Sequence, residues 1–192
     1  MNGLNIKIEI GYLPGEKMNK KEIRIEKNFL PSIFFNKLKD LVTGRYFPWY
    51  FLNYTIAGVK QDKDFMFYHI LYNTDGSLTS SEYFKDFEPI LYFFDGKIKI
   101  KKLLRMKLNL YTNQNKIIEH ASHTDINNKL IPNPHATISL LNFVNCNGGT
   151  NVEGKKYSSK ENELLIFNNL NKHSGIVQTD TPTRVVLNIA TI

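Results

Sequence analysis

Two histidines and an aspartate have the types and spacing of a metal site. His123 and Asp125 are separated by one residue, so on an extended chain their side chains point to the same face. His173, much further along the chain, offers a third ligand. Two imidazoles and one carboxylate form the facial triad that binds Fe(II) and leaves half of its coordination sphere open for substrate and O2.

Arg184 follows His173 within the mostly apolar segment 183–189. A strand there places Arg184, Val186 and Asn188 on one face. A guanidinium on the inner face of a barrel is costly without a partner, and it grips a carboxylate through two parallel hydrogen bonds. Such a cation beside an open Fe(II) site indicates a pocket for 2-oxoglutarate.

Each motif also has a simpler interpretation. A His-x-Asp sequence arises by chance, and Asp125 could merely cap the loop 126–128. His173 could lie in a solvated turn, and Arg184 could point outward to a surface carboxylate. The metal-site hypothesis is favoured because the motifs occur in this order, at this separation and within strand-like segments.

Length and composition predict one globular domain. The chain of 192 residues is long enough for a sizeable core, and 42% hydrophobic with 12% aromatic residues argues against disorder. We expect no signal peptide and no membrane partner, because no segment approaches about 20 consecutive apolar residues. The single Cys146 cannot form an internal disulfide, which fits a reducing cytoplasm.

The basic charge leaves a nucleic-acid partner open without favouring it. The net charge is +7 and the pI about 9.3, which permits attraction to acidic surfaces. The lysines are scattered, however, as is typical of a solvated surface. Their densest group, residues 97–102, alternates with isoleucine and is expected to form an edge strand protected by charge.

The first half of the chain combines helical and strand patterns. Pro31 suits the first turn of one helix, and Ser80 or Ser81 would cap a second. The aromatic run 46–54 is expected to pack in the core, although such runs also line substrate grooves. The predicted elements are strands at 21–26 and 65–72 and helices at 30–42 and 81–93.

The second half of the chain is nearly all strand-like. In residues 105–111, Arg105, Lys107, Asn109 and Tyr111 share one face. Many short strands with Gly and Asn turns indicate a mainly β (α+β) fold, a sandwich or jelly roll with flanking N-terminal helices. The predicted strands are 105–111, 116–120, 135–144, 163–167, 175–178 and 184–189, with a tight reversal at 148–150.

These segments together resemble the 2-oxoglutarate/Fe(II) oxygenases, specifically the prolyl 4-hydroxylase-like branch and its phage-encoded relatives. The resemblance covers roughly Leu103 to Ile192, with a weaker similarity in the preceding helices and in residues 47–50. It rests on Arg105-x-Lys107-x-Asn109-Leu110-Tyr111, His123-x-Asp125, Leu141-Asn142, Gly148-Gly149-Thr150, Leu165-Ile166-Phe167, His173-Ser174-Gly175 and the Arg-Val-Val-Leu-Asn-Ile segment 184–189.

The resemblance implies a double-stranded β-helix, cupin-like, with residues 103–192 forming the core that carries the metal and residues 1–102 supplying strands and supporting helices. It further implies that His123, Asp125 and His173 bind Fe(II). Arg184 would bind the distal carboxylate of 2-oxoglutarate, and Tyr111 would contact the same group. The implied reaction consumes O2, converts 2-oxoglutarate to succinate and CO2, and hydroxylates a substrate. Ascorbate as an auxiliary reductant is left open.

The sequence departs from the collagen-type members at two positions. Those members usually carry Lys where this chain has Arg184, and Leu140 stands where a polar or aromatic contact is expected. Both departures concern prolyl specificity more than the cofactor. The substrate is therefore expected to be a peptide, with proline as one option, or a small molecule, in the cytoplasm of a cell or of a phage-infected host.

Two alternatives remain open at this point. The chain could be an oxidative demethylase of nucleic acid from the same superfamily, with the aromatic run 46–54 as its base-stacking lid. It could instead be a metal-binding jelly roll without turnover. The remaining histidines, His69, His120 and His135, are interpreted as structural, with His120 the most plausible exception because it lies close to the triad. The sequence does not indicate an oligomeric state.

Overall fold

Residues 22–56, 64–74, 81–125 and 136–192 are described by a computed structural model of the chain, and antiparallel β-strands dominate them. In chain order the elements are β1 (Ile23–Glu26), α1 (Ser32–Thr43), β2 (Tyr50–Leu52), β3 (Met66–Asn73), α2 (Phe84–Phe87), the 3-10 helix η1 (Glu88–Phe94), β4 (Leu103–Thr112), β5 (Thr137–Asn142), β6 (Gly149–Val152), β7 (Lys155–Ser158), β8 (Leu164–Asn168), β9 (His173–Ile176) and β10 (Thr183–Thr191).

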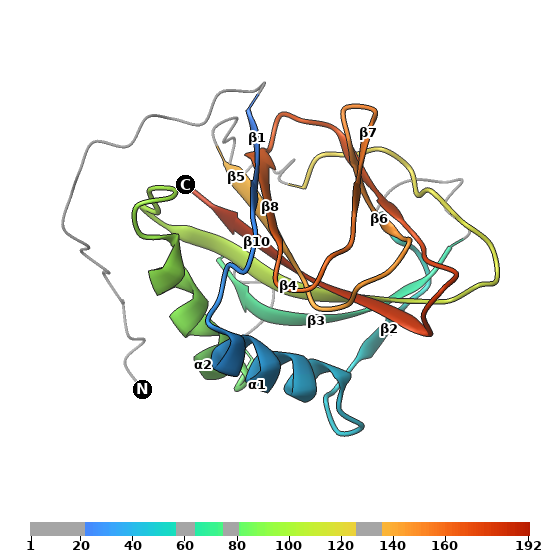
Figure 1. Ribbon diagram of the computed structural model, residues 1–192, viewed down its shortest axis with the longest axis horizontal. Coiled ribbons are helices and arrows are strands. Elements are labelled where there is room, and N and C mark those ends of the chain that lie inside the picture. Colours follow the sequence, from blue (N-terminus) through green and yellow to red (C-terminus); the bar gives the residue numbers. More distant parts are fainter. Residues whose placement is uncertain (1–21, 57–63, 75–80, 126–135) are drawn as a thin grey trace.

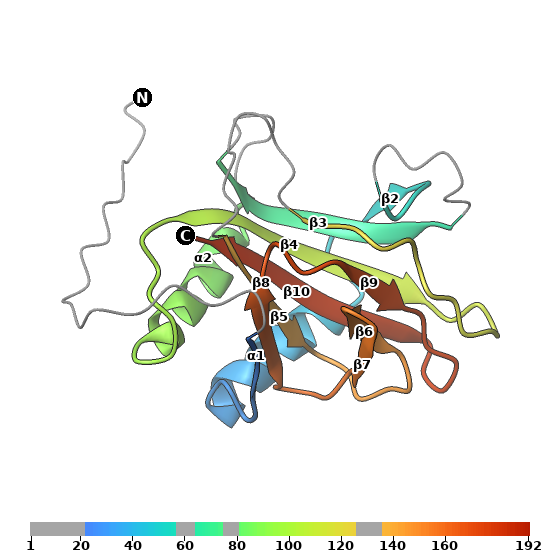
Figure 2. The same cartoon turned by 90° about the horizontal axis from the view of Figure 1, so that it is seen from above.

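The strands form two sheets. The larger has seven strands in the order β1-β8-β5-β10-β4-β3-β2, and the smaller has three in the order β7-β6-β9. Helices α1 and α2 lie on one side of the large sheet, and β6 and β7 lie on the other (Figure 1). Figure 2 shows β10 running between β4 and β5 through the middle of the molecule. The predicted mainly β, jelly-roll fold with flanking helices is confirmed.

The main core lies between the large sheet and the helices. Helix α1 buries Phe35, Leu38 and Val42, whose spacing places them on one helical face. They share one apolar cluster with Val185, Leu187 and Ile189 of β10 and with Met106 and Leu108 of β4. Because side chains alternate along a strand, the intervening residues of β4 and β10 face the other way. That opposite face carries the polar residues discussed below.

The prediction of a strand at 116–120 was wrong. The segment does run beside β9, with the His120 N–H donating to the Gly175 carbonyl oxygen at 2.9 Å. Only isolated bridges form, however, between Glu119 and Ile176 and between His123 and His173. Between these two bridges the chain takes four residue steps from Glu119 to His123 but only three from His173 to Ile176. The extra residue interrupts the ladder as in a β-bulge.

The reversal predicted at 148–150 lies later in the chain. Residues Gly149–Val152 form β6, and the turn is made by Glu153 and Gly154, with φ of 48° and 85°. Two positive φ angles in a two-residue turn suit a hairpin, and this hairpin leads into β7, which the sequence did not indicate. Gly149 is needed for packing, because a Cβ there would collide with the Tyr157 carbonyl oxygen.

Two further predictions, the helix at 81–93 and the edge strand at 97–102, were wrong because the backbone hydrogen bonds follow a different pattern. The helix predicted at 81–93 is a short α2 followed by η1, because Pro89 lacks an N–H and breaks the α-helical pattern. Residues 97–102 form a turn and an irregular segment and not an edge strand. The N–H groups of Lys101 and Lys102 both donate to the Ile192 carbonyl oxygen, at 2.5 and 2.7 Å.

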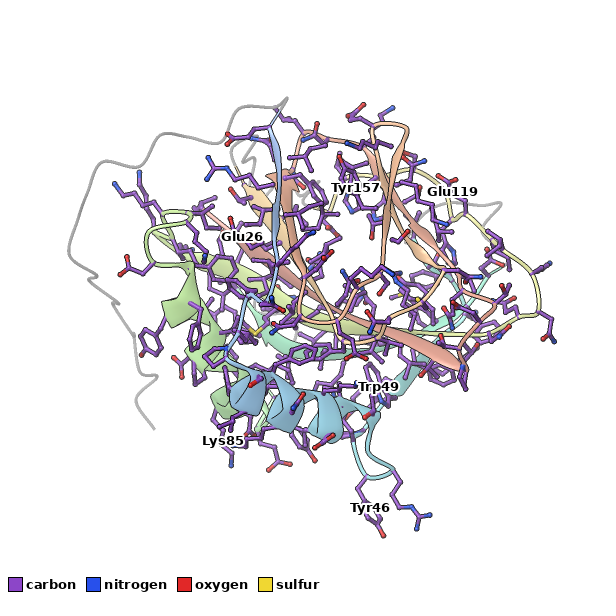
Figure 3. All side chains as sticks on the ribbon, in the orientation of Figure 1. Glu26, Tyr46, Trp49, Lys85, Glu119 and Tyr157 are labelled. Carbon is purple, nitrogen blue, oxygen red and sulfur yellow. The ribbon has the colours of Figure 1, made fainter. Side chains whose placement is uncertain are left out.

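The aromatic run 46–54 packs in the core only in part. Phe47 is buried against Trp49, with ring centroids 5.2 Å apart. Tyr46 is 86% exposed and projects away from the molecule, whereas Trp49 lies against it (Figure 3). Phe51, on the edge strand β2, is also exposed. Within the described ranges, none of the helices has the length and apolar character needed to cross a membrane.

Asn162 connects the start of α1 to the turn before β8. Its side-chain Oδ1 accepts from the Leu30 N–H at 2.9 Å, and its Nδ2 donates to the Leu30 carbonyl oxygen at 2.7 Å. Its φ is 56°, in the left-handed region that Asn tolerates better than most residues. The buried backbone of Leu30 therefore depends on this one amide.

We predict that Asn162→Ala lowers the free energy of unfolding by about 2–4 kcal/mol, since two buried backbone groups lose their partner. Asn115 is the matched control, because it has a similar φ of 58° but is exposed. Asn115→Ala should cost about 1 kcal/mol or less. Urea unfolding measures both values, and equal losses would mean that backbone conformation alone is responsible.

Candidate metal centre and cavity

A cavity of about 980 Å³ opens on the polar face of β4 and β10. All five sequence-predicted site residues line it: Tyr111, His123, Asp125, His173 and Arg184. The strand alternation predicted for residues 105–111 and 184–189 accounts for the positions of Tyr111 and Arg184. Arg184, Val186 and Asn188 all reach the cavity from β10. Leu140 of β5 also lines it, as an apolar wall.

The ligand atoms of His123, Asp125 and His173 lie within 4.8 Å of one another. His123 and His173 are directly opposite across the backbone, each N–H donating to the other's carbonyl oxygen at 2.9 Å. Their ring centroids are 4.5 Å apart. Asp125 Oδ2 lies 3.2 Å from His173 Nε2. Two nitrogen donors and one oxygen donor thus converge from distant parts of the chain, as a facial metal site requires.

Both imidazoles are oriented in the same way. His123 Nδ1 lies 3.2 Å from the Ala121 carbonyl oxygen, and His173 Nδ1 lies 3.4 Å from that of Asn171. A carbonyl oxygen only accepts, so these contacts suit the tautomer with the proton on Nδ1, which leaves the lone pair of Nε2 for a metal. Burial, aided by the neighbouring His173, lowers the pKa of His123. The His123 ring is therefore neutral, as a ligand must be, at neutral pH.

Asp125 is held by two neighbours that the sequence did not reveal as site residues. Arg105 Nη2 donates to Oδ1 at 2.7 Å, and Asn188 Nδ2 donates to Oδ2 at 2.8 Å. Burial would raise the pKa of the Asp125 carboxyl, but Arg105 and the nearby His173 hold it well below its usual range. The carboxylate is therefore ionised and fixed in orientation.

Arg184 is a buried cation at the other end of the same cavity. Only 1% of the residue is exposed. Nη2 donates to Thr150 Oγ1 at 3.2 Å, but Nε has no hydrogen-bond partner and no carboxylate pairs with the guanidinium among the described residues. Burial lowers the pKa of Arg184, and the charge interaction with the Tyr111 hydroxyl partly opposes this; the Tyr111 ring centroid lies 5.4 Å from Arg184 Cζ. Such a group lacks the anion that would compensate its burial.

Lys107 and Asn109 complete the cavity face of β4 between Arg105 and Tyr111. Burial lowers the pKa of Lys107 to about 8, with a smaller contribution from the like charge of Arg105. The alternation of residues 105–111 already placed these side chains on the face of Tyr111. It could not show that this face lines a cavity, because charged residues on one face of a strand usually point to solvent.

The other histidines fall into three cases. His69 is structural, as predicted: its Nδ1 lies 2.7 Å from the Pro48 carbonyl oxygen and its Nε2 2.7 Å from Ser81 Oγ. His120 lines the cavity beside the Tyr111 ring, with centroids 5.4 Å apart, but its ring is not part of the converging donor set. His135 lies outside the described residues.

Solved structures share this fold. An oxidoreductase of the 2OG-Fe(II) oxygenase family from Burkholderia pseudomallei aligns with a TM-score of 0.66 at 10% identity, over 88% of this chain and 84% of that chain. A prolyl hydroxylase from Trichoplax adhaerens, in complex with a hypoxia inducible factor oxygen degradation domain peptide fragment, aligns with a TM-score of 0.58 at 15% identity, over 88% and 83%.

A viral protein is also similar. The collagen prolyl hydroxylase of Paramecium Bursaria Chlorella virus-1, as its 2OG complex, aligns with a TM-score of 0.54 at 12% identity, over 90% of this chain and 97% of that chain. No family model matches the sequence, and no curated protein matches it. The chain therefore has the fold of the 2OG-Fe(II) oxygenases and prolyl hydroxylases, and the predicted resemblance is confirmed at the level of the fold.

We predict that His123→Ala and His173→Ala each abolish tight Fe(II) binding, because each removes one of three converging donors. Metal content after anaerobic loading with Fe(II) measures this directly. His69→Ala is the control, since it also removes a buried imidazole but lies outside the cavity. Full metal content in His173→Ala would contradict the site and make His120 the next candidate.

Proposed function

We propose that this protein is a 2-oxoglutarate- and Fe(II)-dependent dioxygenase that hydroxylates its substrate. The observation that carries the proposal is Arg184, a buried cation without an anionic partner among the described residues, in the cavity that also holds His123, Asp125 and His173. A metal-binding jelly roll without turnover has no need for a buried guanidinium at this position. A dicarboxylate co-substrate does require such a cation, because its distal carboxylate needs a positively charged partner.

His123, Asp125 and His173 would hold the metal. The donor set fits Fe(II), since two imidazoles and an ionised carboxylate leave coordination positions open. Fe(II) and 2-oxoglutarate, when bound, supply the activation of O2 and the oxidative decarboxylation that yields succinate and CO2. The contribution of the chain is orientation: backbone carbonyls fix both rings, and Arg105 with Asn188 fixes the carboxylate.

Arg184 and Tyr111 would bind the distal carboxylate of 2-oxoglutarate. Tyr111 and Arg184 are direct partners in the register of β4 and β10. Their side chains meet at the end of the cavity, where Gly175 also approaches the Tyr111 hydroxyl. The planar guanidinium suits a two-point contact with a carboxylate. The protein's own role here is to position the co-substrate relative to the metal.

The substrate would be a peptide, with proline as one option, or a small molecule. Two of the solved structures described above are prolyl hydroxylases, one of them in complex with a peptide. Formation of succinate from 2-oxoglutarate, with and without proline-rich peptides, free amino acids and methylated oligonucleotides, tests the proposal. No succinate above the level of the His173→Ala variant under any condition would contradict it.

Arg184→Gln should raise the Michaelis constant for 2-oxoglutarate roughly 100-fold, since it removes a charge-assisted two-point contact worth about 3 kcal/mol. Fe(II) content should stay near that of the parent protein. Arg24→Gln, on an exposed position of β1, is the control and should change neither value. An unchanged constant, or loss of iron instead, would overturn the role of Arg184.

Tyr111→Phe tests the second contact. Removal of one hydrogen bond to a charged group costs about 1.5–3 kcal/mol, so the same Michaelis constant should rise roughly ten-fold or more. Tyr157→Phe, on β7 (Figure 3), is the matched control. If the two variants behave alike, Tyr111 is a packing residue of the cavity wall.

A further inference from the structure

Lys107 is a cation in the cavity that the proposed metal site and co-substrate site leave without a role. Its ammonium lies over the ring of Tyr68, with Nζ 5.3 Å from the centroid. Among the described residues its ammonium forms no ion pair or side-chain hydrogen bond, and the Asp125 carboxylate attracts it only from a greater distance. Lys107 is half-buried, and a cation–π contact compensates only part of the hydration that its ammonium loses in the cavity.

The charge of the cavity is unbalanced. Arg105, Lys107, Lys172 and Arg184 line it, and Asp125 is the one carboxylate among its described lining residues. Arg105 is paired with Asp125, Lys172 is exposed, and Arg184 is the proposed co-substrate cation. A divalent metal adds two positive charges and 2-oxoglutarate adds two negative ones, so their binding leaves the net charge of the cavity unchanged. The cavity therefore stays positive when both are bound, and Lys107 is the half-buried cation in it that has neither an ion pair nor a proposed role.

Lys107 lies at a different place from Arg184. Arg184 pairs with Tyr111 in the sheet register, whereas Lys107 pairs with Asn188 of β10 and Ile70 of β3. The four-residue step from Lys107 to Tyr111 corresponds to roughly 13 Å along β4. Lys107 therefore adjoins the metal-ligand end of the cavity, through Asn188 and Asp125, and faces the wall formed by Tyr68 and Ile70.

A second polar group points into the same region. Asn109, the next cavity residue on β4, is 9% exposed, and its Oδ1 has no hydrogen-bond partner among the described residues. Its register partner on β3 is Tyr68, whose ring the Lys107 ammonium contacts. A buried carbonyl oxygen without a donor is costly in the absence of a ligand. The pair thus offers one positive charge and one acceptor side by side.

Resting on the proposed function, we propose that the molecule to be hydroxylated presents an anionic group, a carboxylate or a phosphate, to Lys107, and a hydrogen-bond donor to Asn109. The anion provides the charge that the cavity lacks. It also fixes one end of the substrate beside the metal ligands, while Tyr68 and Ile70 contact its apolar part. A neutral prolyl side chain leaves Lys107 without a partner.

Binding of matched probe pairs tests the proposal without turnover. The protein is loaded anaerobically with Fe(II) and 2-oxoglutarate and titrated by calorimetry with benzoate against benzamide, and with phenyl phosphate against phenol. The parent should prefer at least one anion over its neutral counterpart about ten-fold or more, and the pair that shows the preference identifies the group. Lys107→Met should abolish the preference and leave binding of the neutral probe unchanged, and Lys107→Arg should restore it.

Lys85→Met is the matched control, since Lys85 is exposed on α2, away from the cavity (Figure 3). It should keep the preference of the parent. Asn109→Leu should weaken anion binding less than Lys107→Met does. No preference for either anion in the parent, or the same preference in Lys107→Met, would overturn the proposal.

Binding of 2-oxoglutarate is measured in the same samples, so that failure of the proposed function can be distinguished from failure of the inference about Lys107. If 2-oxoglutarate fails to bind the parent, the proposed function fails, whatever the probes do. If Lys107→Met loses 2-oxoglutarate but keeps its iron, Lys107 holds the co-substrate and the inference about the substrate is wrong. Normal binding of 2-oxoglutarate with loss of the anion preference is the expected result.

Discussion

The register between β4 and β10 is the constraint on which the site depends. It places Val185 and Leu187 in the core beneath the helices and turns Arg184 and Asn188 toward the cavity. A slip of one residue would exchange the two faces of a strand. Arg184 would then be buried among the aromatic and aliphatic side chains of the core. Packing of the apolar face in the core therefore fixes the position of the polar face, and with it the positions of the cavity side chains.

Most of the site could be predicted because its residues follow simple periodicities. The His-x-Asp spacing and the alternation of 105–111 and 184–189 predicted which side chains share a face, and the structure brings these side chains to one cavity. The joining of distant segments, such as His123 with His173, needed the overall jelly-roll arrangement, which the pattern of short strands and the family resemblance supplied. Local sequence was sufficient for the faces of β4 and β10, because these two strands are regular.

The failures lie where tertiary contacts override local pattern. Gly149 was interpreted as a turn residue, but it is a strand residue that needs space beside Tyr157. The aromatic run at 46–54 has the composition of a core, yet Tyr46 and Phe51 are exposed. The position of Lys107 inside a cavity could not be foreseen, since a lysine on an alternating strand normally faces water. Sequence patterns reveal which residues share a face, and only the packed structure reveals what that face meets.

The position of β10 in the sheet affects how the chain can fold during synthesis. Its neighbours β4 and β5 are made first, yet they do not pair with each other, because β10 inserts between them. On a ribosome, both would present unpaired edges until residues 183–191 emerge, and such edges are prone to aggregation. The large sheet is complete only when this late strand arrives. Long-range pairing of this kind also makes folding slow, so a nascent chain would benefit from chaperone protection.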